Sequence, residues 1–281
     1  MEKEEIKEAE KTSGSNFLTY MSRMDYSFRH SSKGFIPMFV KGPKILDVGC
    51  GTGVLIQSLE KMFPSFEIEG IDLNDTMIRQ CKEKGLKAYC RSFYDVDDTY
   101  DTVLFSSVLH EFSSYAKEKE RFTEEPMRRA LFKAHDILKE NGNIIVRDGV
   151  KEDDRINATI TAKTGKQIEA IRKYQADNPF YKNQTLTVNG FDITTNKRFL
   201  KEFLYTYTWG EESYSREVNE VFGILMIDEW IDLVKSCGFE IANIMISAEE
   251  YKKYLEESFD FSSDKENIMQ NATILINAVR K

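Results

Sequence analysis

Three glycines at alternate positions, Gly49, Gly51 and Gly53, follow an apolar run and predict a tight turn that can bind a ligand. Glycine lets a backbone turn sharply and approach a ligand closely. A helix that starts at such a turn offers free amide donors and the positive end of its dipole. A dinucleotide loop would be spaced G-x-G-x-x-G, but Val54 stands at the third position. The stretch therefore predicts a loop that cradles a different ligand.

Two acids accompany this loop. Asp47 lies two residues before Gly49, and Asp72 ends the next apolar run, 23 residues after Gly49. A carboxylate at the end of that second strand can accept hydrogen bonds from both hydroxyls of a ribose. The pair predicts a ligand that contains a nucleoside.

An alternation of strand and helix patterns must position these residues. Apolar runs at 44–49, 66–73, 86–90, 100–106 and 143–150 predict strands, and amphipathic patterns at 54–63, 74–85 and 124–142 predict helices. Strands that alternate with helices imply a mainly parallel, doubly wound α/β sheet. The alternation stops near residue 151 and returns as a helix at 227–238 and two strands at 239–246 and 272–281.

The stretch ILDVGCGTG, followed by GIDLN, resembles the class I S-adenosylmethionine (SAM)-dependent methyltransferases of the small-molecule type. The resemblance covers residues 44–150 and continues at DEWIDLVKSCGFEI. It implies a Rossmann-like, seven-stranded sheet that is mainly parallel, with an antiparallel C-terminal strand. It also implies SAM as the cofactor and methyl transfer as the reaction.

The resemblance assigns the cofactor contacts. The position of Asp47 meets the methionine end of SAM, Gly49, Gly51 and Gly53 approach its backbone, and Asp72 with Leu73 meets the ribose. Ser92 stands where the family commonly has a carboxylate at the adenine amino group, and the amide of Phe93 can serve the adenine ring. Ser106, at the end of the fourth strand, is expected near the sulfonium.

The acceptor is expected beside His110. The segment VLHEF resembles an LHDW-type segment in which the histidine is a general base, and histidine suits proton removal near neutral pH. The alternative is that His110 only shapes the pocket. Arg147 and Asp148 end the fifth strand, and either a substrate contact or an ion pair that fixes the loop fits them equally well.

The chain divides into four predicted parts: an N-terminal helical cap segment (1–40), a SAM-binding core (41–150), an inserted substrate lid (151–225) and the rest of the core sheet (226–281). A helical pattern at 15–40 and the insertion are expected to cover the carboxyl ends of the strands. Tyr207, Trp209 and Arg216 can line a pocket for a planar or anionic acceptor. Equally, the aromatic residues can form the hydrophobic underside of the lid.

Composition narrows the partners. The 281 residues carry a net charge of −8, which argues against tight binding to phosphate backbones. No apolar run is long enough to span a bilayer, and four cysteines without a CxxC pair fit free thiols in a reducing compartment. With three histidines in the chain, a histidine-rich metal site is not expected. We therefore expect a cytoplasmic enzyme with a small-molecule substrate, no resident metal, no membrane and no nucleic acid.

Two alternatives stay open at this level. One is a methyltransferase acting on RNA or on a nucleotide end, which the mildly basic stretch 151–202 favours slightly. An NPPY-like tetrapeptide, typical of amino methylation on bases, does not follow the fourth strand, where SSVL stands instead. The other alternative is a protein that binds SAM without transferring its methyl group.

Overall fold

The computed structural model describes residues 31–247 and 254–281. Most of the helix expected at 15–40 lies outside these ranges. The described end of that segment forms a short 3-10 helix, η1 (Ser32–Met38), capped by the side chain of Ser31. No helix within the described ranges combines the length and the apolar character that a bilayer crossing requires.

A seven-stranded sheet forms the core, in the order β3-β2-β1-β4-β5-β11-β9. Its strands are β1 (Lys44–Val48), β2 (Glu67–Asp72), β3 (Ala88–Cys90), β4 (Tyr100–Ser106), β5 (Leu138–Gly149), β9 (Phe239–Ser247) and β11 (Thr273–Arg280). Strands β1 to β5 pair in parallel, and β11 runs antiparallel to both β5 and β9. This topology confirms the predicted fold class, including the antiparallel C-terminal strand.

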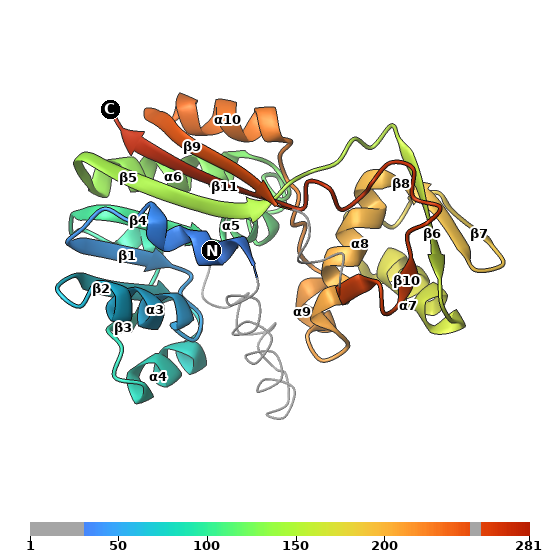
Figure 1. The fold of residues 1–281 in the computed structure, drawn as a ribbon, viewed down its shortest axis with the longest axis horizontal. Coiled ribbons are helices and arrows are strands. Elements are labelled where there is room, and N and C mark those ends of the chain that lie inside the picture. The colour runs from blue at the N-terminus through green and yellow to red at the C-terminus, as the bar shows by residue number, and fades with distance from the viewer. Residues whose placement is uncertain (1–30, 248–253) are drawn as a thin grey trace.

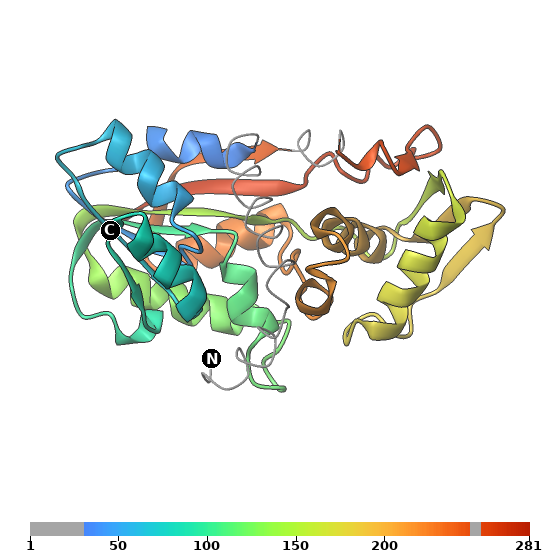
Figure 2. The same ribbon diagram turned by 90° about the horizontal axis from the view of Figure 1, so that it is seen from below.

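Helices cover both faces of this sheet, as Figure 2 shows. They are α3 (Val54–Met62), α4 (Asp75–Glu83), α5 (Leu109–Ser114), α6 (Glu125–Ile137) and α10 (Ile227–Ser236), with a short 3-10 turn η2 (Phe93–Asp95). One apolar cluster joins η1, α3 and α4 to one face through Ile45 and Leu104. A larger cluster joins α6 and α10 to the other face through Ile144 and Val146. Successive residues of a strand therefore point to opposite faces of the sheet and join different clusters.

Local sequence signals explain most helix ends. The side chain of Asn74 accepts hydrogen bonds from the first amides of α4, and Gly85, with φ +77°, follows its end. The helix predicted at 124–142 is shorter than expected. It ends at Ile137, because Leu138 adopts an extended conformation and pairs with Tyr100 at the start of β5.

The insertion carries a sheet of its own, which the sequence patterns did not predict. Its order is β10-β6-β8-β7, and its elements are β6 (Asn157–Ala162), α7 (Gly165–Asp177), β7 (Leu186–Asn189), β8 (Asp192–Asn196), α8 (Lys197–Trp209), α9 (Tyr214–Glu217) and β10 (Phe259–Asp260). The strands are short and rich in threonine, so their two-residue period is weak. Strand β10 comes from beyond residue 226, so the small sheet draws on two separate parts of the chain.

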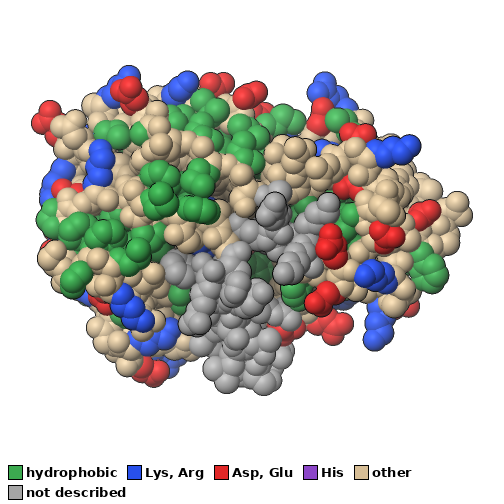
Figure 3. All heavy atoms as spheres, in the orientation of Figure 1, with side chains coloured by type: hydrophobic (Ala, Val, Ile, Leu, Met, Phe, Trp, Pro, Cys, Tyr) green, Lys and Arg blue, Asp and Glu red, His purple; other side chains and the backbone are tan. Residues whose placement is uncertain are grey.

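The inserted unit lies beyond the carboxyl end of β5, beside the core sheet (Figure 1). The chain enters it directly from Gly149 and returns to the core at α10. On the part of the face in Figure 3 where the residues are described, Lys and Arg side chains are scattered among Asp and Glu side chains and form no continuous basic stripe. The junction between the core sheet and the inserted unit thus lies at the carboxyl end of β5, the edge where open α/β sheets bind ligands.

Candidate functional site

The glycine loop joins β1 to α3 in a conformation that needs glycine. Gly49, Gly51 and Gly53 have φ values of +69°, +52° and +77°, a region that residues with a side chain rarely adopt. A Cβ atom on Gly49 would also lie 2.5 Å from Cγ2 of Val108, which precedes α5. The loop thus packs closely against the end of β4 and leaves its amides at the start of α3.

Asp72 orients this loop from the end of β2. Its Oδ2 atom accepts a hydrogen bond from the amide of Gly51 at 2.9 Å, and its Oδ1 atom accepts one from the amide of Asn74 at 2.8 Å. Burial raises the pKa of the Asp72 carboxyl, and these amide bonds oppose the rise. Each oxygen can accept a further bond, so the carboxylate can hold the loop and two ribose hydroxyls together.

Asp47 lies under the loop, near the end of β1, and is 2% exposed. Burial raises the pKa of its carboxyl to about 7, the charge of Lys33 lowers it, and the charge of Asp72 raises it again. A buried carboxyl of this kind is stabilised in its ionised form by a cationic ligand. The ammonium and sulfonium groups of SAM supply such a charge.

The other predicted cofactor residues line the same edge of the sheet. Leu73 is half-buried directly after β2, and Ser106 ends β4. Ser92 caps η2 by accepting a hydrogen bond from the amide of Tyr94. Phe93 is buried, with its ring packed edge-on against Phe105.

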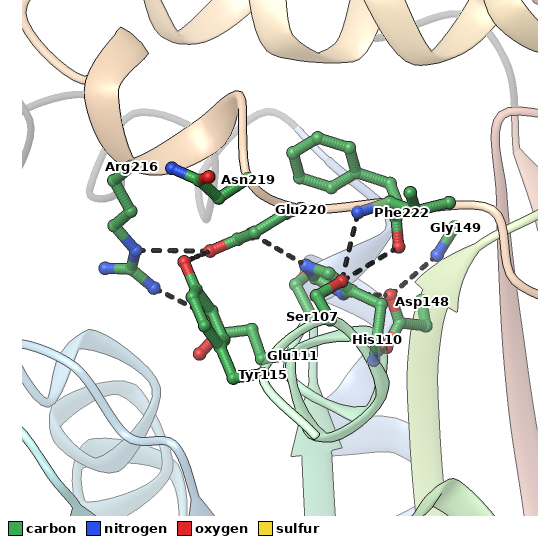
Figure 4. A network of polar contacts seen from close by, with 12 residues as sticks. Ser107, His110, Glu111, Tyr115, Asp148, Gly149, Arg216, Asn219, Glu220 and Phe222 are labelled. Carbon is green, nitrogen blue, oxygen red and sulfur yellow. Dashed lines mark hydrogen bonds and ion pairs between the residues drawn. The ribbon is translucent and has the colours of Figure 1, made fainter. Parts of the chain in front are cut away.

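His110 sits between two carboxylates at the junction of the core and the insertion (Figure 4). It lies in α5 and is 3% exposed. Its Nδ1 atom is 2.6 Å from Oδ1 of Asp148, at the end of β5, and its Nε2 atom is 3.3 Å from Oε2 of Glu220, from the insertion. The ring of Phe222 packs on the imidazole at 5.0 Å between centroids.

This surrounding favours a protonated ring. Burial alone lowers the pKa of His110, but the charge and hydrogen bond of Asp148, followed by those of Glu220, outweigh it and hold the pKa well above its usual value. Asp148 also accepts hydrogen bonds from the amides of His110 and Gly149 at 3.1 and 2.8 Å. The imidazolium is therefore held as a donor to both carboxylates in this conformation.

Further groups surround Glu220. Tyr115 donates its hydroxyl to Oε1 of Glu220 at 2.7 Å, and Nε of Arg216 lies 3.3 Å from the same oxygen. Arg216 also donates to Glu111 at 2.8 Å. The sequence did not predict Glu220 and Tyr115 as site residues, because neither belongs to a recognisable motif or spacing.

Ligand atoms of His110, Glu111 and Glu220 lie within 4.8 Å of one another, a separation that a metal ion could bridge. However, the guanidinium of Arg216 already donates to both carboxylates. Burial raises the pKa of Glu111 to about 7, which Arg216 opposes. We therefore infer that the guanidinium of Arg216 and the imidazolium of His110 balance the negative charges of Glu111 and Glu220.

Arg147 and Asp148 point to opposite faces of β5. Arg147 is 2% exposed and donates to the hydroxyls of Ser32 and Ser107 at 3.1 and 2.6 Å, on the η1 side. Asp148 faces α5 and His110. Of these two residues, Asp148 is the one that contacts His110.

The contacts described for the predicted aromatic residues of the insertion, Tyr207 and Trp209, are not with His110 or its two carboxylates. The hydroxyl of Tyr207 bonds to Gln167 and Ser258 at 3.3 and 3.1 Å, and its ring packs against Phe259, inside the inserted unit. Trp209, at the end of α8, is half-buried against the larger apolar cluster. Of these predicted insertion residues, Arg216 contacts Glu220, the carboxylate that faces His110.

Comparisons with known proteins agree with this arrangement. A family model described as a methyltransferase domain matches residues 39–215, more than half of the chain. Malonyl-[acyl-carrier protein] O-methyltransferase 1 of Ilyobacter polytropus is 42% identical over 53 residues, which are 17% of this chain and 20% of that protein. The corresponding enzyme of Bacillus anthracis is 33% identical over 72 residues, 24% of this chain and 27% of that one. The matches thus span only about a quarter or less of these relatives.

Solved structures are similar to this chain at low sequence identity. A SAM-dependent methyltransferase from Methanosarcina mazei is 13% identical, with a TM-score of 0.49 over 88% of this chain and 96% of that chain. By the match of the family model, this chain belongs to the methyltransferase domain family.

Proposed function

We propose that this enzyme transfers the methyl group of SAM to a small-molecule acceptor, at oxygen or nitrogen, and that His110 is its catalytic residue. The observation that carries the proposal is the buried pair of His110 and Asp148, whose atoms Nδ1 and Oδ1 are 2.6 Å apart at the carboxyl ends of two neighbouring strands. Ligands of open α/β sheets bind at that edge.

In this proposal the cofactor lies across the glycine loop. Asp47 meets its methionine end, Gly49, Gly51 and Gly53 pass along its backbone, and Asp72 with Leu73 holds its ribose. Ser92 and Phe93 flank the adenine, and Ser106 lies by the sulfonium. The support is that these positions share one edge of the sheet and that the loop has the required glycine conformation.

The acceptor side is formed by Asp148 and Arg216, with His110 between the core and the insertion. Arg147, Tyr207 and Trp209 remain proposed substrate contacts. Since Tyr207 is bonded inside the inserted unit, its contact with an acceptor would require the insertion to rearrange. In this proposal the chain divides into a cap segment (1–40), a SAM-binding core (41–150), a substrate lid (151–225) and the rest of the core sheet (226–281).

A small molecule fits better than RNA or a nucleotide end. His110, Asp148 and Glu220 are buried, and the described residues on the face in Figure 3 form no basic stripe for a phosphate backbone. The names of the two curated relatives, which act on a malonyl group on a carrier protein, also favour an acyl acceptor over a base. A salt-dependent gel shift with RNA would contradict this choice.

Turnover of labelled SAM with a panel of carboxylates, phenols, amines and nucleotides tests the proposal. His110→Ala should lower the transfer rate by about a hundredfold or more. SAM affinity should stay within about twofold of the wild-type value, because the ring faces the acceptor side. His135→Ala, a histidine packed against Phe239 on the far helix α6, is the matched control. Full activity of His110→Ala on a true substrate would reduce His110 to a pocket wall.

A further inference from the structure

The carboxylate of Glu220 is surrounded by donors from two parts of the molecule. From α5 and the residue after it, Nε2 of His110 and the hydroxyl of Tyr115 reach it at 3.3 and 2.7 Å. From the insertion, Nε of Arg216 reaches it at 3.3 Å. Glu220 is 1% exposed, so these donors form a buried anion-binding site that a side chain of the protein fills.

We propose that this three-donor site is the acceptor subsite, that Glu220 occupies it in place of the substrate, and that the acceptor brings a carboxylate to it. The inference rests on the proposed function and narrows its acceptor to one chemical class. A carboxylate matches the site because it accepts several hydrogen bonds at once, as the Glu220 side chain does here. A protonated amine would face the same three donors without any lone pair to accept from them.

The loop that carries Glu220 does not depend on this side chain for its position. The amide of Val221 donates to the hydroxyl of Ser114 at 3.0 Å. The amides of Phe222 and Gly223 donate to the carboxylate of Glu202 at 2.7 and 2.6 Å. The backbone is thus anchored on both units by contacts that do not involve the side chain of Glu220.

Exchange of one carboxylate for another preserves the charge of the subsite. The cations His110 and Arg216 already face the acids Glu111, Asp148 and Glu220, so an added anion needs one of them to withdraw. Glu220 is the acid whose position the substrate would take. Its withdrawal leaves the donors in place for the acceptor.

The reaction balances without a base. A lone pair of the acceptor carboxylate oxygen forms a bond to the methyl carbon, and the carbon–sulfur bond of SAM breaks with its electron pair kept by sulfur. The products are a methyl ester and neutral S-adenosylhomocysteine, and no proton is transferred. His110 then acts as a donor that holds the acceptor, which agrees with the imidazolium described above.

Filling the subsite with a small carboxylate tests the inference directly. Glu220→Ala removes the resident carboxylate, and acetate is the probe. We expect acetate to raise the melting temperature of Glu220→Ala saturably, by at least about 2 °C, and to shift the NMR signal of the His110 ring. Chloride at equal ionic strength should do neither.

The matched control is Glu217→Ala, which removes another buried acid, at the end of α9. Among the described residues, no hydrogen bond or ion pair joins the Glu217 carboxyl to the three donors, and burial raises its pKa. Acetate should therefore leave this variant and the wild type unchanged. An equal response of all three proteins, or no response of Glu220→Ala, would overturn the proposed subsite.

A second measurement uses the wild-type enzyme and does not depend on the folding of a variant. Labelled SAM is incubated with matched acceptors that carry a carboxylate or an amine on the same ring. A labelled product that releases methanol in alkali identifies a methyl ester and supports the inference. Transfer to amines alone would overturn it and leave the proposed small-molecule function intact, whereas a protein that binds no SAM would contradict the function itself.

Discussion

Asp148→Asn is the sharpest test of how the histidine site is held together. Asp148 is 1% exposed, and its two oxygens accept three hydrogen bonds, from Nδ1 and the amide of His110 and from the amide of Gly149. An asparagine keeps the shape but has one oxygen and an NH2 group. One donor therefore loses its acceptor, and the imidazolium loses the nearer of its two negative partners.

The cost follows from these contacts. Loss of a hydrogen bond to a charged group costs about 1.5 to 3 kcal/mol, and an orphaned buried donor costs about 1 to 3 kcal/mol. Because Glu220 still faces the ring at 3.3 Å, we expect a value in the lower half of the sum. A loss of about 3 kcal/mol corresponds to a fall in melting temperature of about 6 to 12 °C for a chain of this size.

The loss should depend on pH. The pKa of His110 is raised in the folded protein, so its contribution to stability is fully present below the unfolded pKa of about 6.5 and is lost as pH rises through the folded value. Asp148→Asn removes part of that contribution. The difference in unfolding free energy between wild type and variant should therefore be largest near pH 6 and shrink as pH rises.

Urea unfolding at several pH values measures this difference, and NMR of the His110 ring reports its titration directly. Asp136→Asn, an exposed aspartate on α6, is the control and should change stability by less than about 0.5 kcal/mol. The same loss at pH 6 and at pH 9, or an unchanged His110 titration, would refute the ion pair as the source of stability.

Three further predictions concern the cofactor and the loop. Asp72→Ala should weaken SAM binding at least about 100-fold, since two ribose hydroxyls and two loop amides lose their acceptor, and calorimetry that finds wild-type affinity would contradict the assignment. Because the pKa of Asp47 is about 7, mainly through burial, binding of cationic SAM near pH 6 should release a proton. Well above pH 7 it should release none, and calorimetry in buffers of different ionisation enthalpy shows the difference, which Asp47→Asn should abolish. Glu202→Gln should loosen the two anchored loop amides by about 1 to 3 kcal/mol and speed their hydrogen exchange, while SAM affinity stays the same.

The fold and the cofactor loop could be predicted from sequence because their signals are local. The glycines at 49, 51 and 53, the acid at Asp72 and the alternating apolar runs each act over a few residues, and they predicted a mainly parallel α/β sheet; the resemblance added its seven strands. The small inserted sheet could not be predicted in the same way. Its strands are short and polar, and one of them, β10, comes from beyond the insertion.

The sequence by itself predicted the glycine loop with its two acids and the histidine that follows the fourth strand. Only the tertiary structure decided the surroundings of that histidine. Asp148 and Glu220 are 38 and 110 residues from His110, and nothing in their spacing marks them as its partners. Strand pairing brings Asp148 to α5, and packing of the insertion brings Glu220. The protonation of His110 depends on both charges in a buried place, so it is a property of the folded chain and not of the motif.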